Sequence, residues 1–493
     1  MKKIVLSPQQ QEIVDFIPTL LSDKTINSIS IKAFAGCGKS FILKYIANLY
    51  INKKFLGLAF NSSIVSENKK EFPKRNSKWF TLHGFAREYL KKFGVNIDFK
   101  NARAEYKPLE LIEILKFKDT GQFQLAENIK NVMKVFCQSS LKNITEEGII
   151  KAAKGQKNSE VLGINKRALP VVCEYVRKLW VMFEKNEIAP TFDFYLKYFE
   201  IKRFAEEITE FDFIELDEAQ DSNAVTMSII FQMNAKKIFV GDEHQSIYGF
   251  RGTINALNYA DKLFYLSTTY RYIPEIADFA NEILKGYKLE KVSIQSNAKK
   301  KTVKKPTKAF LSRNNSSMIS LIDEFIKAKE EFTTVKDPKE LFAAAIAILE
   351  IRLENETTQK GYEYLNQFRG IEEIEDYIEE TGDREIQSAF KMQQRYGKKL
   401  YFLQTQANIF YRQKNKKFQY ILSTAHTSKG LEWDSVKLLE DFPDIQKMLK
   451  NEKIDSPREL MKRYKENNYK ANEIIQEINL WYVAVTRARY EVE

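Results

Sequence analysis

The stretch IKAFAGCGKS, residues 31–40, decides the fold that we expect of this chain. Residues 28–31 alternate polar and apolar side chains, as a strand does, and residues 41–47 repeat apolar side chains with the spacing of a helix. A strand that enters a helix through a loop of small residues is typical of the phosphate-binding loops of α/β proteins. The sequence therefore predicts an α/β fold organised around this loop.

The side chains of the loop suit phosphate chemistry. Gly36 and Gly38 lack a Cβ, so the backbone around them can curl into a ring of N–H donors, and the N-terminus of the following helix adds partial positive charge. Lys39 would reach the β- and γ-phosphates of a nucleotide, and the Ser40 hydroxyl would hold Mg²⁺. Ala33 stands where the usual pattern has its first glycine, so a glycine-rich turn without a ligand stays open for this motif alone.

Further candidate residues follow two later strand-like runs. Residues 211–216 lead directly into DEAQD, which starts with Asp217 and Glu218. Asp217 would bind the metal ion, and Glu218 would polarise the attacking water. Residues 237–240 lead into GDEHQ, where Gln245 could sense a γ-phosphate. An acidic loop after a strand is the simpler alternative, but together with a phosphate loop these residues indicate a nucleoside triphosphatase.

The composition favours several domains and an anionic partner. Of the 493 residues, 44% are hydrophobic and 13% are aromatic, which is enough for more than one apolar core. Lysine and arginine number 78 against 66 acidic residues, and this net charge of +12 favours nucleic acid, with charge for solubility alone as the alternative. Cys37, Cys137 and Cys173 indicate neither a disulfide framework nor a zinc site. We also expect no leader peptide and no membrane span, and therefore a cytoplasmic protein.

Two long segments differ from the alternating α/β pattern around them. Residues 88–195 and residues 321–400 carry amphipathic helical patterns, and we expect each to be a helical insertion, the second one reduced in size. The expected parts are residues 1–87 and 196–265 for the first lobe (1A), 88–195 for its insertion (1B), 266–320 and 401–493 for the second lobe (2A), and 321–400 for the second insertion (2B).

Aromatic and basic residues cluster just after Gln245. Tyr248, Phe250 and Arg251 lie within four residues of one another, and aromatic rings with a guanidinium group are suited to stacking on exposed bases. Taken one at a time, such aromatic residues belong more often to a hydrophobic core. The cluster is therefore a candidate nucleic-acid contact that depends on the motifs around it.

Taken in order, these pieces resemble the superfamily 1A DNA helicases of the UvrD/Rep kind. Within that family the chain is most similar to the F-box DNA helicase branch, without the F-box. The motifs that carry the resemblance are AFAGCGKS, LAFNSS, TLHGFA, DEAQD, VGDEHQSIYGFRG, TYRYIPEIADFAN, TAHTSKGLEWDSVKLLEDF and YVAVTRA. The resemblance implies two RecA-like P-loop lobes with mainly parallel sheets, each carrying a helical insertion.

The resemblance also implies a role for each matching position. The residues expected in catalysis are Lys39, Asp217, Glu218, Gln245, Arg271 and Arg487, the two arginines serving to neutralise charge on the transferred phosphoryl group. The residues expected to bind ATP are Gln10, Ala35, Gly36, Cys37, Gly38, Lys39, Ser40, Phe41, Tyr270, Gly430 and Glu432, with Gln10 and Tyr270 at the adenine. Mg²⁺ is expected on Ser40 and Asp217. The residues expected to hold single-stranded DNA are Phe60, Asn61, His83, Tyr248, Phe250, Arg251, Thr424 and His426.

The implied function is ATP-dependent translocation on single-stranded DNA in the 3′ to 5′ direction, with unwinding at single-strand/duplex junctions. Two alternatives stay open: a translocase that strips proteins from DNA without unwinding it, and a DNA-sensing ATPase subunit that regulates a partner such as a nuclease. The chain departs from the family at several points, among them the shorter second insertion and Glu477, which is followed by Ile478 and Asn479 where a charged pair is common. Phe250 stands where many relatives have tryptophan, and the sequence ends at Glu493, before the strand and tail that we expect after Arg489.

Overall fold

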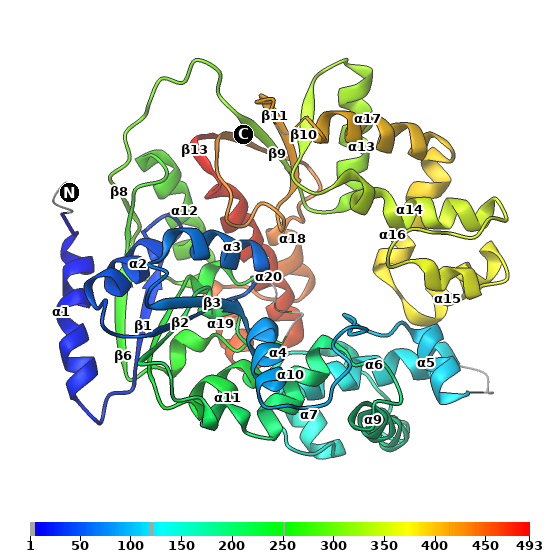
Figure 1. Ribbon diagram of the computed structural model, residues 1–493. Coiled ribbons are helices and arrows are strands. Elements are labelled where there is room, and N and C mark those ends of the chain that lie inside the picture. The colour runs from blue at the N-terminus through cyan, green and yellow to red at the C-terminus, as the bar shows by residue number, and fades with distance from the viewer. Residues whose placement is uncertain (1–4, 118–121, 248, 250–251, 414) are drawn as a thin grey trace.

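The structure is a computed structural model that describes residues 5–117, 122–247, 249, 252–413 and 415–493 (Figure 1). Its centre consists of two sheets of parallel strands with helices packed around them. The expected α/β class with mainly parallel sheets is therefore confirmed. In the part of the chain that the structure describes, no helix is both long enough and apolar enough to cross a membrane.

The first sheet has six parallel strands in the order β3-β2-β4-β5-β1-β6. The strands are β1 (Ser28–Ala33), β2 (Phe55–Ala59), β3 (Ser77–Thr81), β4 (Phe213–Leu216), β5 (Lys236–Gly241) and β6 (Lys262–Leu266). Although β4 and β5 come much later in the chain, they pair between β2 and β1. The loops that follow β1, β5 and β4 therefore lie in consecutive positions along one edge of the sheet.

Both faces of this sheet are covered, because its central strands are apolar on both sides. Every residue of β2 and β4 is buried, as expected for parallel strands with helices on each face. One face packs against α1 and α2, and the other face packs against α4 and α11. The helices of this lobe are α1 (Pro8–Ser22), α2 (Lys39–Leu49), α3 (Ser62–Glu71), α4 (Leu82–Lys92) and α11 (Ala224–Gln232).

The first insertion is helical and shares a core with one face of the first sheet. Its helices are α5 (Pro108–Leu115), α6 (Gln122–Gln138), α7 (Glu146–Gly155), α8 (Ser159–Leu162), α9 (Leu169–Glu184) and α10 (Phe192–Ile201). Helix α6 packs against α5, α7 and α9, and α10 packs against α4 of the lobe. Apolar residues of these helices and of β4 belong to one continuous cluster, so the insertion is held firmly against the sheet.

The second sheet has five parallel strands in the order β10-β11-β9-β12-β13. The strands are β9 (Lys308–Ser312), β10 (Phe332–Thr334), β11 (Tyr420–Thr424), β12 (Trp433–Leu438) and β13 (Ala488–Val492). The expectation that the chain ends before a closing strand is wrong, because β13 pairs with β12 along its length. Helices α12 (Pro274–Lys288), α13 (Asn315–Lys327) and α20 (Tyr469–Val485) pack around this lobe, and β7 (Thr268–Thr269) pairs with β8 (Gln295–Ser296).

The second insertion is mostly helical and contacts the first. Its helices are α14 (Pro338–Arg352), α15 (Ile371–Thr381), α16 (Arg384–Tyr396) and α17 (Lys399–Tyr411), and α15 lies against α6. Two shorter helices, α18 (Ile445–Asn451) and α19 (Pro457–Lys465), pack on α20. The range 321–400 is not purely helical, because it includes β10. The exact boundaries of the four parts stay a prediction.

Candidate functional site

The expected phosphate loop connects β1 to α2. Gly38 precedes the first turn of α2 with a φ of 87°, and Gly36 has a φ of 72°, a left-handed conformation that favours glycine. A Cβ at Gly36 would lie 2.6 Å from both Arg271 Cβ and Thr269 Oγ1. The loop and the segment that carries Arg271 therefore approach too closely for a side chain between them. All seven expected loop residues, Ala35, Gly36, Cys37, Gly38, Lys39, Ser40 and Phe41, lie in this loop and the first turn of α2.

The two acidic residues that follow β4 lie opposite this loop. Glu218 Oε1 is 3.2 Å from Lys39 Nζ, and the backbone N–H of Glu218 donates to Asp217 Oδ1 at 2.9 Å. Glu218 has a φ of 53°, a left-handed conformation that is uncommon for residues with a side chain and clusters at functional sites. The structure therefore joins the expected metal ligand, the expected base and the expected phosphate lysine in one place.

The electrostatic surroundings give the two carboxyl groups different pKa values. Burial and the Glu218 carboxylate raise the pKa of Asp217 to about 6. Burial also acts to raise the pKa of Glu218, but the Lys39 and Lys429 ammonium groups outweigh it and hold that pKa below its usual range. Glu218 is therefore ionised at neutral pH, and two neighbouring carboxyl groups with different pKa values can take different roles.

A lysine from the second lobe reaches the same acidic residues. Lys429 Nζ lies 2.5 Å from Asp221 Oδ2 and 3.5 Å from Glu218 Oε2, and it donates to the backbone carbonyl of Gln245 at 2.9 Å. Lys429 follows β11, whereas the three groups that it contacts belong to the first lobe. This side chain therefore ties the two lobes together at the candidate catalytic centre.

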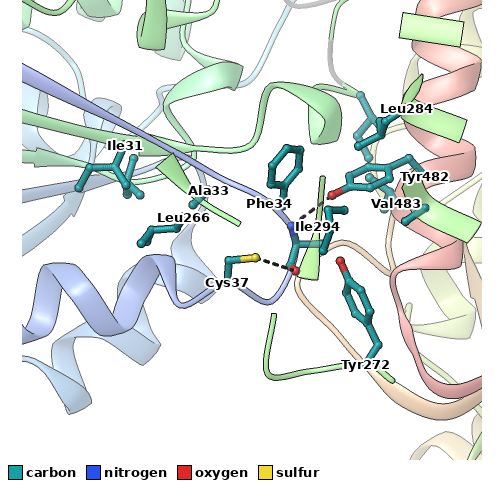
Figure 2. Close-up of a cluster of buried hydrophobic side chains, with 14 of the residues drawn as sticks. Ile31, Ala33, Phe34, Cys37, Leu266, Tyr272, Leu284, Ile294, Tyr482 and Val483 are labelled. Carbon is teal, nitrogen blue, oxygen red and sulfur yellow. Dashed lines mark hydrogen bonds between the residues drawn. The ribbon is translucent and has the colours of Figure 1, made fainter. Parts of the chain in front are cut away.

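A chain of hydrogen bonds also crosses between the lobes, and Figure 2 shows its end at the phosphate loop. Arg487 Nη2 donates to Gln245 Oε1 at 3.4 Å, and Gln245 Nε2 donates to Asp242 Oδ2 at 2.7 Å. The Tyr482 hydroxyl donates to the same Asp242 oxygen at 3.0 Å and accepts from the backbone N–H of Ala35 at 3.2 Å. The phosphate loop, the loop after β5 and α20 are thus connected through buried polar groups.

Two arginines from outside the first sheet lie beside the loop. Arg271 Nε is 2.7 Å from Glu432 Oε2. Glu432 lies two residues after Gly430, and its carboxylate also binds Arg489. Arg487 is 1% exposed, and burial, assisted by the charge of Arg271, lowers its pKa to about 9. Arg487 is therefore still charged at neutral pH, and none of the described carboxylates forms an ion pair with it. Because a buried cation is costly without an anion, a bound phosphate group fits this environment.

The two residues expected at the adenine lie at the rim of the loop. Gln10 is 5% exposed, and its Nε2 would lie 3.3 Å from a Cβ placed on Gly38. Its Oε1 accepts from the backbone N–H of Ser7 and so completes the cap of α1. Tyr270 is 51% exposed, and its backbone N–H donates to Gly36 O at 3.2 Å. An exposed ring and a buried amide therefore flank the loop, and the adenine role of both residues stays a prediction.

The residues expected to hold DNA are divided between the two lobes. Phe60 and His83 line a cavity of about 480 Å³ at the carboxyl ends of β2, β3 and β4, which also reaches the acidic residues after β4. Asn61 is exposed and caps α3. Thr424 and His426 lie at the carboxyl end of β11 in the second lobe. Tyr248, Phe250 and Arg251 lie outside the described residues.

Comparison with known proteins agrees with this geometry. Residues 19–264 match the UvrD/REP helicase N-terminal domain. The chain belongs to the UvrD/Rep helicase family. It is 24% identical over 506 residues to F-box DNA helicase 1 of Gallus gallus (94% of this chain, 46% of the relative), and 27% identical over 509 residues to F-box DNA helicase protein 1 of Schizosaccharomyces pombe (94% and 54%). This UvrD/Rep-family chain thus spans about half the length of these relatives.

Another match is more limited. One subunit of the ATP-dependent helicase/nuclease of Oenococcus oeni is 27% identical over 260 residues, which cover 47% of this chain and 22% of the relative. The F-box relatives instead align with 94% of this UvrD/Rep-family chain. The similarity to them therefore extends over both lobes and both insertions.

Three residues of this UvrD/Rep-family site are absent from the sequence-based set. Lys429 lies inside TAHTSKGLEW, and Asp242 lies three residues before Gln245, so both belong to motifs that the sequence already marks. Tyr482 is the first residue of YVAVTRA, but an aromatic residue in the apolar run of α20 reads as part of a core. Only the fold shows that its hydroxyl group joins the phosphate loop to Asp242.

His426 makes the free energy of unfolding of this UvrD/Rep-family chain depend on pH. Burial and the Arg313 guanidinium lower the pKa of His426 to about 4, whereas an unfolded histidine titrates near 6.5. The unfolded chain therefore binds the extra proton between these values, and the free energy of unfolding decreases as the pH falls from about 6.5 to about 4. We expect His426→Gln to remove about 2 kcal/mol of the stability loss between pH 7 and pH 5, measured by urea unfolding at both pH values. Identical losses in the variant and the unmodified chain would contradict this assignment.

Proposed function

We propose that the chain is an ATP-dependent DNA helicase that hydrolyses ATP between its two lobes and moves along single-stranded DNA. The observation that carries the proposal is the hydrogen-bond chain that joins Ala35 to Arg487 through Tyr482, Asp242 and Gln245. This chain of bonds links the phosphate loop of the first lobe to a buried arginine of the second lobe. An enzyme whose lobes move in response to nucleotide requires such a connection. The names of the F-box relatives support DNA as the substrate.

The residues around the loop have complementary tasks in this proposal. Lys39 and the loop N–H groups bind the β- and γ-phosphates, and Ser40 with Asp217 would hold Mg²⁺, which neutralises phosphate charge when bound. Glu218 is ionised and accepts a proton from the attacking water. Arg271 and Arg487 neutralise the charge that develops on the transferred group. The shared Glu432 carboxylate holds Arg271 and Arg489 in place.

Movement along DNA would follow from the same contacts. Lys429 binds the backbone carbonyl of Gln245, and the loop after Gln245 leads to the aromatic residues that we expect at the DNA. A change in lobe separation on ATP binding would therefore act on nucleotide and DNA residues together. Stacking on aromatic rings tolerates any sequence because every base has a π-face. The net charge of +12 suits the DNA backbone, and a 3′ to 5′ direction is the expectation from the family.

The first test is the steady-state ATPase rate with and without single-stranded DNA, for the unmodified chain and for Lys39→Ala. We expect DNA to stimulate hydrolysis at least tenfold in the unmodified chain, and we expect the variant to lose at least 99% of that rate because the phosphates lose their lysine. Equal rates with and without DNA, in protein that is folded by circular dichroism, would contradict the proposal. Unwinding of a 3′-tailed duplex is then measured, because a helicase separates its strands and a translocase that only strips proteins does not.

A further inference from the structure

The segment that follows the GDEHQ motif, residues 246–252, is held by two side chains of α20. Asn479 Nδ2 donates to the backbone carbonyl of Ser246 at 2.7 Å. Gln476 Oε1 accepts from the backbone N–H of Gly249 at 3.1 Å. The segment belongs to the first lobe, whereas α20 packs in the second lobe, so both hydrogen bonds cross between the lobes.

A buried lysine fixes the orientation of the Asn479 amide. Lys288 Nζ donates to Asn479 Oδ1 at 2.7 Å. Burial lowers the pKa of Lys288 to about 8, so its ammonium group is still mainly charged at neutral pH. An ammonium group can only donate hydrogen bonds, so the amide oxygen of Asn479 must face Lys288. The amide nitrogen is then left to face Ser246, and Asn479 is 2% exposed.

Glycines let this segment pack closely against its neighbours. A Cβ at Gly249 would lie 2.8 Å from Gln476 Cδ. A Cβ at Gly252 would lie 2.8 Å from Cγ and Cδ of Gln156, at the end of α7. Gln156 Nε2 in turn donates to the backbone carbonyl of Val135 in α6 at 3.1 Å. The segment is therefore packed against both α20 and the first insertion.

The same helix also contacts the phosphate loop. Gln476, Asn479 and Tyr482 follow one another at intervals of three residues, which places them along one face of α20. Figure 2 shows Tyr482 pointing from α20 toward the phosphate loop, where its hydroxyl accepts from the backbone N–H of Ala35. With a rise of 1.5 Å per residue, Gln476 lies about 9 Å along the helix from Tyr482. One helix face therefore contacts the phosphate loop and the segment after GDEHQ.

We propose that Gln476 and Asn479 are positioning residues that set how strongly bound nucleotide changes the affinity for single-stranded DNA. The inference rests on the proposed function and assigns this coupling to two residues outside the expected catalytic and DNA-binding sets. Gly249 lies in the sequence between Tyr248 and Phe250, two of the residues expected at the DNA. The contact at Gly249 therefore acts on the segment that carries them. Because coupling between binding sites is reciprocal, the same contacts set how strongly DNA changes the affinity for nucleotide.

The test measures the Kd of the full chain for a fluorescent oligothymidylate, with and without a non-hydrolysable ATP analogue and Mg²⁺. We expect the analogue to change this Kd at least fivefold in the unmodified chain and less than twofold in Gln476→Met, which keeps the size of the side chain but loses the acceptor. Gln476→Glu keeps an oxygen for the Gly249 N–H and should retain the fivefold change. Gln446→Met is the matched control, because Gln446 of α18 also makes one hydrogen bond, to the Tyr287 hydroxyl at 3.0 Å.

Two further variants break the same contacts in other ways. Gly249→Ala adds a methyl group that displaces the Gln476 amide, so it should cause the same loss of coupling, and adding Gln476→Met to it should cause no further loss. Asn479→Asp keeps an acceptor for Lys288 but loses the donor to Ser246, and it should also reduce the change to less than twofold. Affinity for the analogue without DNA should stay within twofold in every variant.

The outcomes separate the inference from the proposed function. Loss of coupling in Gln476→Met and Gly249→Ala, with the fivefold change retained in Gln476→Glu and Gln446→Met, supports the inference. A Gln476→Met chain that unfolds at the original temperature and keeps the fivefold change overturns the inference alone. An equal loss in Gln446→Met also overturns it, because the effect would then belong to the second lobe in general. An unmodified chain that binds no single-stranded DNA overturns the proposed function and this inference with it.

Discussion

Glutamine in place of Glu218 is expected to lower the turnover of ATP hydrolysis by about 10²- to 10⁴-fold, because the side chain loses its ability to accept a proton from the attacking water. The amide keeps the shape of the carboxylate, but its single oxygen can accept from only one of the two lysines, since Lys39 lies 3.2 Å from Oε1 and Lys429 lies 3.5 Å from Oε2 of Glu218. Lys429 still has Asp221 and the backbone carbonyl of Gln245 as partners. The loop and the lobe contact should therefore survive. Binding of ATP should be unchanged or tighter, since Lys39 no longer has a competing carboxylate.

In the proposed mechanism, Lys39 would prevent the Glu218 carboxylate from acting as a base until nucleotide is bound. The Lys39 and Lys429 ammonium groups stabilise the charged form of Glu218 and so make it a weak base. A γ-phosphate would draw Lys39 away and raise the proton affinity of Glu218 at that moment. We therefore expect single-turnover hydrolysis to be slow in Glu218→Gln even when a fluorescent nucleotide binds normally.

The matched control for this variant is Glu243→Gln. Glu243 belongs to the same lobe and also pairs with a lysine, since its Oε1 is 2.9 Å from Lys32 Nζ. It has no contact with Lys39 or Lys429 among its described interactions, and we expect less than a threefold change in turnover. Equal losses in the two variants, or a Glu218→Gln rate above one tenth of the original, would show that Glu218 is not the base.

Sequence patterns predicted those parts of the candidate site in which the functional residues directly follow a strand. The phosphate loop and the Asp217–Glu218 pair each follow a buried strand directly, so a short stretch contains both the strand and its functional end. The contacts of Tyr482 and Lys429 could not be found in this way although both residues lie in marked motifs, because their partners lie hundreds of residues away in the chain. The roles of these residues become visible only when both lobes are folded against one another.

Two features of the fold also escape sequence reasoning for physical reasons. Strand β10 has three residues between two helices, which is too short for an alternating pattern to appear. Phe123 belongs by sequence to the first insertion, yet it packs with Phe368 and Tyr377 of the second insertion. An apolar residue on a helix predicts burial but does not identify the surface that buries it. The contact between the two insertions therefore depends on the tertiary arrangement alone.

Lysine in place of Arg487 is expected to lower ATP turnover by about 10³-fold or more, because arginine groups that neutralise a transferred phosphoryl group contribute 10³–10⁵ in related enzymes. Lysine keeps the positive charge but cannot reproduce the planar set of donors. Arg487 donates to the backbone carbonyls of Val483 and Leu431 and to Gln245 Oε1. The variant should therefore also weaken the link between the phosphate loop and α20, while DNA binding without nucleotide stays within threefold.

Arg489→Lys provides the matched control, since Arg489 lies two residues further along and binds Glu432 at a more exposed position. We expect it to lose less than tenfold in turnover, measured as ATPase rate at saturating single-stranded DNA, with thermal unfolding as the check on folding. Similar losses in both variants would assign the effect to the local structure around α20 instead of to phosphate chemistry. A specific loss at Arg487 has a further consequence. Because this guanidinium enters from the second lobe, hydrolysis would require the lobes to be closed, and each ATP consumed would then be coupled to one closing movement across the DNA.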